Sequence, residues 1–262
     1  MRIATWNINS VRLRIGLVER LIDEQQPDVI CLQETKTQDD TFPHAALAAK
    51  GYAHRAINGM KSYNGVAILS RLPFAQTGIH NWQGKEDCRH IFAMLENGIE
   101  IHNCYVPAGG DLPDPEANPK FAHKLGFMDE QAAWWAKADK KKARILVGDL
   151  NVAPLEHDVW SHKQMLDVVS HTPVEVDKFS RWQAAHRWVD AVRHFVPHDE
   201  KLYSWWSYRA ADWAASNRGR RLDHIWVTPD LAPSLVAQNI LRDVRGWEPK
   251  PSDHVPVIID LG

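Results

Sequence analysis

Apolar residues in the first hundred positions gather in short compact runs, a pattern typical of buried strands. Four runs predict strands at residues 2–6, 28–32, 65–69 and 99–106. Between the first two, apolar residues recur at helical spacing, at Val11, Ile15, Val18 and Ile22. We expect Asn9 or Ser10 to cap this helix and Pro27 to mark its end.

The second half of the chain also mixes helices and strands. Asn118-Pro119 is a cap and first-turn pair for a helix with apolar positions Phe121, Leu125, Met128, Ala132 and Trp135. After the basic stretch 137–144, residues 145–147 predict a strand. A third helix is outlined by Trp182, Ala185, Trp188, Val189, Val192 and Phe195. Residues 222–227 and 255–259 predict closing strands, the second near an edge because Pro256 cannot donate to a ladder.

No repeat, linker or low-complexity tract divides the 262 residues, so we expect one domain over residues 1–262. Strands are spread through both halves, and only three helices are clear. A doubly wound sheet needs a crossover helix after almost every strand. The pattern therefore favours an α/β fold with two packed sheets flanked by helices.

Composition excludes several classes of protein. With 44% hydrophobic and 24% charged residues, the chain is typical of a globular protein rather than a fibrous or disordered one. No apolar run approaches the roughly 20 residues of a membrane-spanning helix. Lys and Arg total 31 against 33 Asp and Glu, so a polyanion must be bound by local patches. Three unpaired cysteines and the lack of a signal-peptide pattern favour a cytoplasmic protein.

Polar residues suited to catalysis follow directly after the predicted strands, where loops on a rigid scaffold can converge. These are Asn7, Asn9, Glu34, Tyr105, Asp149, Asn151, Asp223, Asp253 and His254. Taken singly, each has a structural explanation, as a helix cap, a turn former or a half-buried aromatic. Together they match phosphodiester hydrolysis, which needs a base for water and donors to the phosphate oxygens.

The same residues bear on the choice of metal. Mg²⁺ prefers a few carboxylate oxygens and keeps several waters, so Glu34 and one further acid suffice, with Mn²⁺ as an alternative. Zinc is disfavoured because the chain has neither cysteine-rich ligand spacing nor a His-Glu-x-x-His segment.

Six blocks, in this order, resemble the signature of the exonuclease III family of abasic-site DNA repair nucleases. They are Thr5-Trp6-Asn7-Ile8-Asn9, Leu32-Gln33-Glu34-Thr35-Lys36, Tyr105-Val106-Pro107, Gly148-Asp149-Leu150-Asn151-Val152-Ala153, Arg221-Leu222-Asp223 and Ser252-Asp253-His254. The resemblance implies a four-layer, DNase I-like α/β sandwich with the site at one end of the sheets. It also implies a metal-dependent cut 5′ to an abasic site that leaves a 3′-hydroxyl, with 3′-phosphatase, 3′-phosphodiesterase and 3′→5′ exonuclease activities.

The resemblance implies a role for each site residue. Glu34 is the main metal ligand, with Asn7 and Asp253 nearby. Asp149, positioned by Asn151, activates water. His254, oriented by Asp223, binds the scissile phosphate, and Tyr105 donates to that phosphate. A carboxylate and an imidazole can exchange roles when their pKa values shift, so the choice of base between Asp149 and His254 stays open.

A stretch rich in aromatic residues and cations, 203–221, is predicted to hold DNA. The family resemblance implies that Trp205 forms the wall of the abasic pocket, and the remaining candidate contacts are Arg209, Arg218, Arg220 and Asn9. Asn9 and Arg220 replace residues of other branches of the family, Asp and Trp, which favours the bacterial branch. The predicted partner is duplex DNA with abasic sites or blocked 3′ ends, and we expect a monomer.

Two alternative functions remain at this stage. The same fold can act mainly as a 3′-end-processing exonuclease or phosphatase, or on another phosphodiester. A DNA-binding relative that has lost catalysis is the other alternative.

Overall fold

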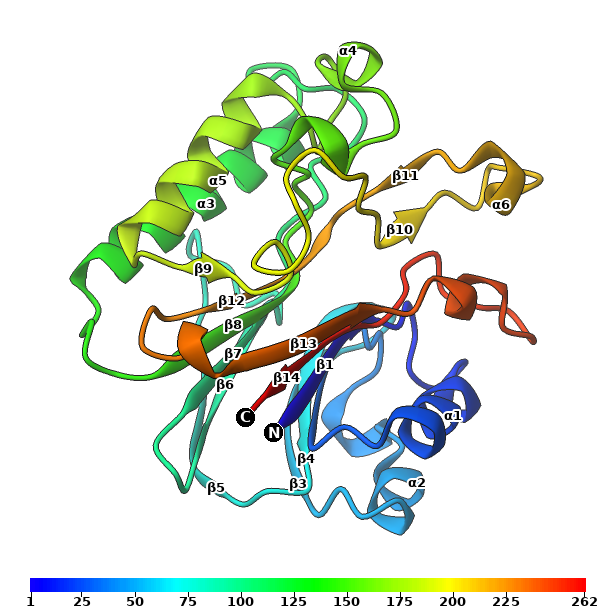
Figure 1. Ribbon diagram of the computed structural model, residues 1–262, viewed down its shortest axis with the longest axis vertical. Helices are drawn as coiled ribbons and strands as arrows, with labels where there is room; N and C mark the ends of the chain where they lie inside the picture. Colours follow the sequence, from blue (N-terminus) through cyan, green and yellow to red (C-terminus); the bar gives the residue numbers. More distant parts are fainter.

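The computed structural model describes residues 1–262 and contains two six-stranded mixed sheets packed face to face (Figure 1). In order across the first sheet lie β13 (Leu235–Ile240), β14 (Val257–Leu261), β1 (Arg2–Asn7), β2 (Val29–Gln33), β4 (Tyr63–Ser70) and β3 (His54–Met60). Across the second lie β5 (Phe74–Ile79), β6 (His90–Leu95), β7 (Glu100–Cys104), β8 (Arg144–Asp149), β12 (Asp223–Val227) and β9 (Val189–Asp190). The predicted fold class is confirmed.

Helices cover the outer face of each sheet. On the first sheet lie α1 (Ile15–Gln25) and α2 (His44–Ala49), and on the second lie α3 (Pro119–Lys137) and α5 (Pro173–Ala185) (Figure 1). The remaining short elements are α4 (His162–Met165), α6 (Trp213–Ser216), the hairpin β10 (Trp205–Trp206) with β11 (Gly219–Arg220), and 3-10 turns η1 (Asp39–Thr41), η2 (Glu156–Asp158), η3 (Ala232–Ser234) and η4 (Arg242–Gly246). No helix is long and apolar enough to cross a membrane.

Strands with two buried faces explain the compact apolar runs. Ile3 points into the core between the sheets, whereas its neighbour Ala4 packs under the helices of the first sheet. In the second sheet, Ile145 and Val147 face the central core and Leu146 faces α3 and α5. Successive side chains alternate between faces, so a strand buried on both must be apolar throughout.

Three predicted boundaries are wrong. Helix α1 begins at Ile15 after Arg14, and neither Asn9 nor Ser10 caps it, because both have left-handed backbone angles in the preceding turn. The third helix, α5, starts earlier, at the Thr172–Glu175 capping box, and ends at Ala185. The apolar residues that follow it are turns and β9, whose Val189 pairs with Val227.

Strand β14 lies directly beside the edge strand of its sheet, so the prediction that it is near an edge is confirmed, although β14 itself is paired on both sides. It lies between β1 and β13, and Pro256 precedes it rather than interrupting its ladder. The edge strand, β13, has mostly exposed or half-exposed residues and so carries no compact apolar run. The predicted cap of α3 is also confirmed, since the Asn118 side chain accepts a hydrogen bond from the Lys120 amide.

The interface between α3 and the second sheet buries two neutral histidines. His90 Nε2 lies 3.0 Å from His102 Nδ1, and the Trp82 indole donates to His90 Nδ1 at 3.2 Å. Burial lowers the pKa of both rings, that of His102 to about 4 despite the opposing charge of Glu100. Protonation of either ring is therefore unfavourable in the folded protein.

Acid is expected to destabilise the protein over the pH range between the ordinary pKa of His102 and its lower pKa in the folded protein. The pKa of His102 is lower in the folded state than its ordinary 6.5, so its contribution to stability is present above pH 6.5 and is lost as pH falls toward 4. The loss reaches about 3 kcal/mol at pH 4, since one pKa unit is about 1.4 kcal/mol. Urea unfolding at pH 7, 5.5 and 4.5 should show this decline, and a shallower one in His102→Gln. An equal slope in both proteins would contradict the assignment.

Candidate active site

The register of the strands brings the predicted site residues to one end of both sheets. β1 and β2 run parallel and end at Asn7 and Gln33, so Glu34 emerges beside Asn7. In the other sheet, β8 ends at Asp149, opposite Asp223 at the start of antiparallel β12. The Asn7 amide nitrogen donates to Glu34 Oε1 at 2.9 Å and to Asp149 Oδ2 at 2.8 Å. One side chain thus joins the ends of the two sheets at which the candidate residues gather.

The backbone at this end is held in unusual conformations. Asn9, Glu34 and Asn151 have φ angles of 47°, 49° and 53°. Asparagine tolerates the left-handed region, but glutamate does so at a cost. Strain of this kind is concentrated at functional sites, where the surrounding structure maintains it. At Gly148, a Cβ atom would lie 1.9 Å from the Cys104 carbonyl oxygen, so only glycine lets β7 and β8 approach this closely before Asp149.

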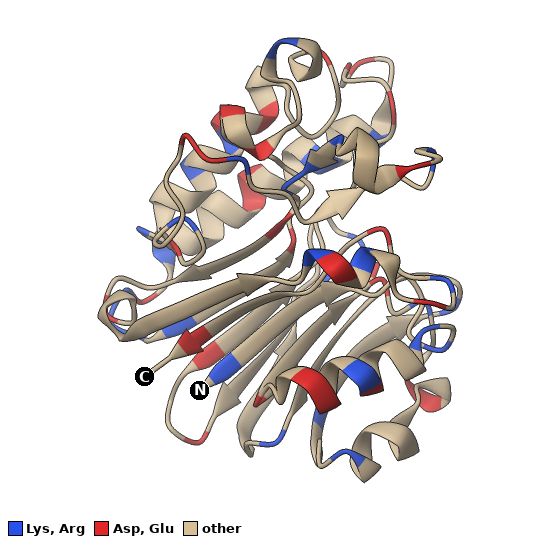
Figure 2. Cartoon of the chain, turned by 45° about the vertical axis from the view of Figure 1, so that its right-hand side comes forward, with Lys and Arg blue, Asp and Glu red and all other residues tan.

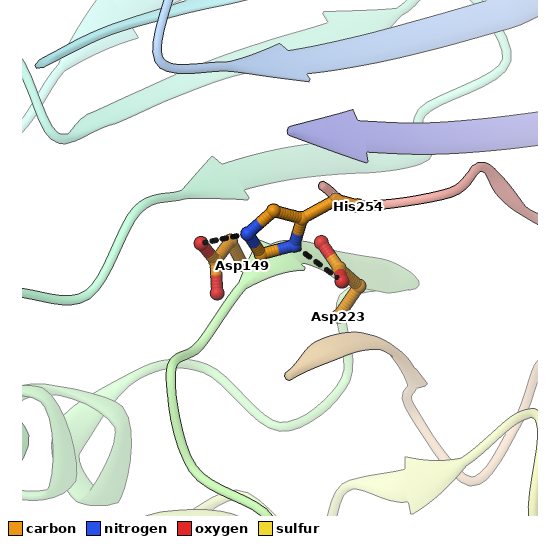
Figure 3. Close-up of side chains that lie close together, drawn as sticks. All are labelled: Asp149, Asp223 and His254. Carbon is orange, nitrogen blue, oxygen red and sulfur yellow. Dashed lines mark hydrogen bonds and ion pairs between the residues drawn. The ribbon is translucent and has the colours of Figure 1, made fainter. Parts of the chain in front are cut away.

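His254 lies between two carboxylates (Figure 3). Its Nδ1 is 2.8 Å from Asp223 Oδ2, and its Nε2 is 3.6 Å from Asp149 Oδ2. All three residues are buried. Burial alone lowers the pKa of His254, but the negative charges of Asp223 and Asp149 outweigh it and raise the pKa to about 10. The ring is therefore an imidazolium at neutral pH, with both N–H groups directed at acids.

Burial has the opposite consequence for Asp149. It raises the pKa of that carboxyl to about 7, against the favourable charge of His254 and the hydrogen bond from Asn7. The backbone N–H of Asn151 donates to Asp149 Oδ1 at 3.1 Å, while the Asn151 amide group donates to the Val106 carbonyl. Asn151 thus contacts Asp149 through its backbone. A carboxylate whose pKa lies near neutrality is suited to accept a proton.

Glu34 is the ionised carboxylate of the site. Burial raises its pKa, but Lys36 and the Asn7 hydrogen bond more than offset this and lower it overall. Tyr105 Oη donates to Glu34 Oε1 at 2.9 Å, and Lys36 Nζ lies 2.7 Å from Oε2. In this structure the tyrosine hydroxyl is therefore bonded to the carboxylate. The Lys36 ammonium is a positive charge on the partly exposed side of Glu34.

Asp253 lies on a different side of the cluster from Glu34. Its Oδ1 accepts from the Asn9 amide at 3.2 Å, and its Oδ2 accepts from the Trp205 indole at 2.9 Å. Arg220 lies over the Trp205 ring at 5.0 Å and donates to Ser170 Oγ. Asp253 and Asn9 thus connect the carboxylates to this aromatic wall.

The other two predicted DNA contacts are farther out. Arg209 and Arg218 are exposed, and Arg218 lies over the Trp160 ring at 4.6 Å. The excursion that carries them, β10–α6–β11, extends from the body of the molecule above the end of the sheets (Figure 1).

Several residues that hold the site were not singled out from the sequence. Ser204 Oγ donates to Asp223 Oδ2 at 2.6 Å and accepts the Leu222 and Asp223 amides. Its position within the aromatic stretch was the only local signal. Lys36 follows Glu34 in the quoted block, but no local pattern shows that its ammonium returns to that carboxylate.

A fully buried ion pair supports the loop after Asp149. Lys124 on α3 donates to the Asn151 carbonyl at 2.7 Å, to the Ala108 carbonyl at 3.3 Å and to Glu175 on α5. Glu175 also accepts from the Ser170 and Thr172 amides. The helical spacing of α3 placed this lysine beside apolar core positions, but nothing in the spacing indicates its partner.

Replacing Lys124 with methionine is expected to lower the free energy of unfolding by about 3–5 kcal/mol, because it leaves the Glu175 charge buried without its cation. The double variant Lys124→Met with Glu175→Leu should recover much of this loss. Urea denaturation followed by circular dichroism measures both. A double variant no more stable than the single one would show that packing, rather than charge, sets the cost.

Comparison with known proteins agrees with this geometry. The model of the endonuclease/exonuclease/phosphatase family matches residues 4–254. The exodeoxyribonuclease III of Haemophilus influenzae and an exodeoxyribonuclease of Bacillus subtilis are each 31% identical, over 98% of both chains. An AP endonuclease from Archaeoglobus fulgidus has a TM-score of 0.91 at 31% identity. The Neisseria 3′ phosphatase NExo, bound to a product DNA hairpin, has 0.92 at 30%. Each alignment covers 100% of this chain and 99% of the other.

Proposed function

Because the chain belongs to the endonuclease/exonuclease/phosphatase family and is a DNA repair nuclease within it, we propose that it cuts duplex DNA on the 5′ side of an abasic site and leaves a 3′-hydroxyl. The observation that carries this proposal is the Asn7 amide, which joins Glu34 to Asp149 at the ends of two different sheets. It places an ionised carboxylate, a carboxylate of raised pKa and the adjacent imidazolium around one position where a phosphate can bind.

Nucleases of this family are metal-dependent, and the residues at Glu34 fit a hard cation. Glu34 is ionised, and the Lys36 ammonium already lies against one of its oxygens. The side-chain oxygen of Asn7 is a second hard donor; here it accepts from the Asn9 amide at 3.1 Å, while the Asn7 nitrogen faces Glu34. We assign Mg²⁺ to Glu34 and Asn7, with Mn²⁺ as the alternative, and Asp253 to the rim of this site. When bound, the cation supplies Lewis-acid stabilisation of charge on the phosphate oxygens.

A second group of possible ligands is less suited to a cation. Ligand atoms of Asp149, Asp223 and His254 all lie within 4.8 Å of one another. However, the raised pKa of His254 keeps both ring nitrogens protonated, and a protonated nitrogen has no lone pair for a metal. These residues are instead suited to accept and donate protons.

The geometry supports a division of the proton chemistry. Asp149 takes the proton of the attacking water, and the Asn151 backbone holds its carboxylate. The His254 imidazolium donates to a non-bridging phosphate oxygen, while Asp223 fixes the ring through Nδ1. Tyr105, now bonded to Glu34, is close enough to this cluster to donate to the same phosphate. This assigns the base to Asp149, the choice that the sequence left open.

The excursion after β10 supports recognition of the damage. Trp205 is half-buried, with Arg220 against its ring. An abasic nucleotide has no base to unstack, so it costs less to extrude than an intact one. Trp205 and Arg220 line the sugar, and Arg209, Arg218 and Asn9 contact the strand.

One assay tests the function directly. The protein is incubated with a duplex that carries a single abasic analogue, in Mg²⁺ or in EDTA, beside an intact duplex. We expect one cut 5′ to the lesion, none in EDTA and none in the intact strand. Cutting of the intact duplex at the same rate would contradict specificity for damage.

Processing of 3′ ends is a second activity, favoured by two neighbours in particular. Both are structures of Neisseria NExo, one described as a 3′ phosphatase and the other as a 3′-5′ exonuclease. A duplex with a nick bearing a 3′-phosphate, assayed beside the abasic duplex, ranks the two activities. Faster release of phosphate than cutting at the abasic site would make 3′-end processing the main activity.

A further inference from the structure

A cavity of about 490 Å³ lies beside the active site and has no assigned role. Three segments form it: the turn before α1, the stretch from β10 to the start of α6, and the end of η4 with the loop that follows it. The last two extend to the same side of the molecule, and both carry basic residues (Figures 1 and 2). Six residues are central to it: Arg14, Tyr208, Trp213, Arg245, Glu248 and Lys250.

Arg245 is a cation with no carboxylate in direct contact, although the negative charge of Asp253 acts on it. It is only 5% exposed, and it forms no ion pair with any carboxylate. Its Nε donates to the Trp206 carbonyl at 3.2 Å, but its two Nη atoms have no hydrogen-bond partner. Its guanidinium lies over the rings of Tyr208, at 5.0 Å, and Trp213, at 5.5 Å. The two Nη nitrogens are free to donate to an anion in the cavity, and hydrogen bonds from arginine to phosphate are among the strong ones.

The other charges of the cavity favour an anion as well. Arg14 donates hydrogen bonds to the Lys250 and Pro251 carbonyls and to Tyr208 Oη, so its guanidinium stabilises the wall of the cavity. Lys250 is exposed, and its ammonium has no partner. Glu248 is the one carboxylate among the lining residues, and it forms no ion pair. Three cations therefore face one acid.

The cavity is connected to the catalytic cluster. Arg14 donates to the Asn9 carbonyl, and the Asn9 side chain donates to Asp253. Tyr208 Oη donates to the Pro251 carbonyl at 2.8 Å, three residues before His254. A DNA strand that reaches His254 can therefore continue over this cavity.

We propose that the cavity is a second phosphate subsite, in which Arg245 and Lys250 bind a backbone phosphate of the DNA strand next to the one that is cleaved. The Tyr208 ring, 49% exposed, supports the adjoining sugar. The subsite rests on the proposed function, because a nuclease that acts within a duplex must hold the flanking strand. It contributes to affinity and not to the chemical step.

The test compares Arg245→Gln and Lys250→Gln with Lys141→Gln, whose side chain lies on the exposed turn between α3 and β8. Binding of the abasic duplex is measured in EDTA over a series of salt concentrations. Each subsite variant should weaken binding about tenfold and reduce the slope of log K against log salt by up to about 0.9, whereas Lys141→Gln should match the wild type. With Mg²⁺, KM should rise while kcat stays within about twofold.

Several results would overturn the proposal. An unchanged salt slope in both variants would show that neither residue contacts a phosphate. A fall in kcat at constant KM would show a role in catalysis instead. Inorganic phosphate is titrated as a competitor: competition that disappears in Arg245→Gln supports the subsite, whereas phosphate that binds at Arg245 without weakening duplex binding would indicate a site for free anions only. Should Arg245→Gln fail to fold, Lys250→Gln and Arg245→Lys carry the test. Because binding is measured without hydrolysis, loss of the proposed nuclease activity would be seen separately.

Discussion

Asp149→Asn is expected to lower kcat by about 10³-fold while leaving the affinity for abasic duplex nearly unchanged. Asparagine keeps the shape of the side chain and one acceptor oxygen, so it retains one of the two hydrogen bonds from Asn7 and Asn151, but it cannot accept the proton of the attacking water. Single-turnover cutting measures the rate, and binding in EDTA measures the affinity. The matched control is Asp167→Asn, an exposed carboxylate that should have no effect on either.

The same variant separates catalysis from stability. The folded-state pKa of Asp149, about 7, lies above its ordinary 3.8, so the folded protein binds the proton more tightly than the unfolded chain. Ionisation of this group therefore reduces stability as pH rises from about 4 toward 7, and that loss persists above pH 7. A neutral amide removes the loss, and Asp149→Asn should be at least as stable as the wild type at pH 7.5. A variant that is both inactive and unstable would point to a structural role instead.

Glu34→Gln is expected to lower kcat/KM by about 10²–10³-fold at millimolar Mg²⁺, with partial recovery at higher concentration. The amide keeps an oxygen for the Tyr105 hydroxyl but loses the charge that attracts a cation. Binding of Mn²⁺, followed by electron paramagnetic resonance without DNA, measures the site independently of activity and should weaken in parallel. Glu96→Gln removes an exposed carboxylate and is the control. Unaltered Mn²⁺ binding in Glu34→Gln would move the metal elsewhere, with Asp149 and Asp223 as the next candidates.

Local sequence determined the elements with strong local signals. Compact apolar runs predicted the central strands, because a strand buried on both faces must be apolar throughout. Asn118-Pro119 located the start of α3, where the cap and the fixed φ of proline act within one turn. The blocks around Asn7, Glu34, Asp149, Asp223 and His254 identified the candidate chemistry because each immediately precedes or follows a core strand.

Only the tertiary structure decided how these pieces are related. Asn7 and Asp149 are 142 residues apart in the chain, yet their side chains are bonded. Likewise, β14 lies inside its sheet because β13, a mostly exposed strand, pairs along its other side. Sheet order depends on such long-range pairing, about which the period of a single strand carries no information.

The sequence showed which ionisable groups the site contains, but only the tertiary structure decided their ionisation states. Residue types showed that Asp149 and His254 could exchange protons, but their pKa values depend on burial and on which carboxylates face the ring. Ser204, Lys36, Lys124 and Arg245 are ordinary residues in the sequence. Their roles come from the atoms that folding places beside them: the sequence determined which groups are available, and the packing of two sheets decided which of them meet and in what state of charge.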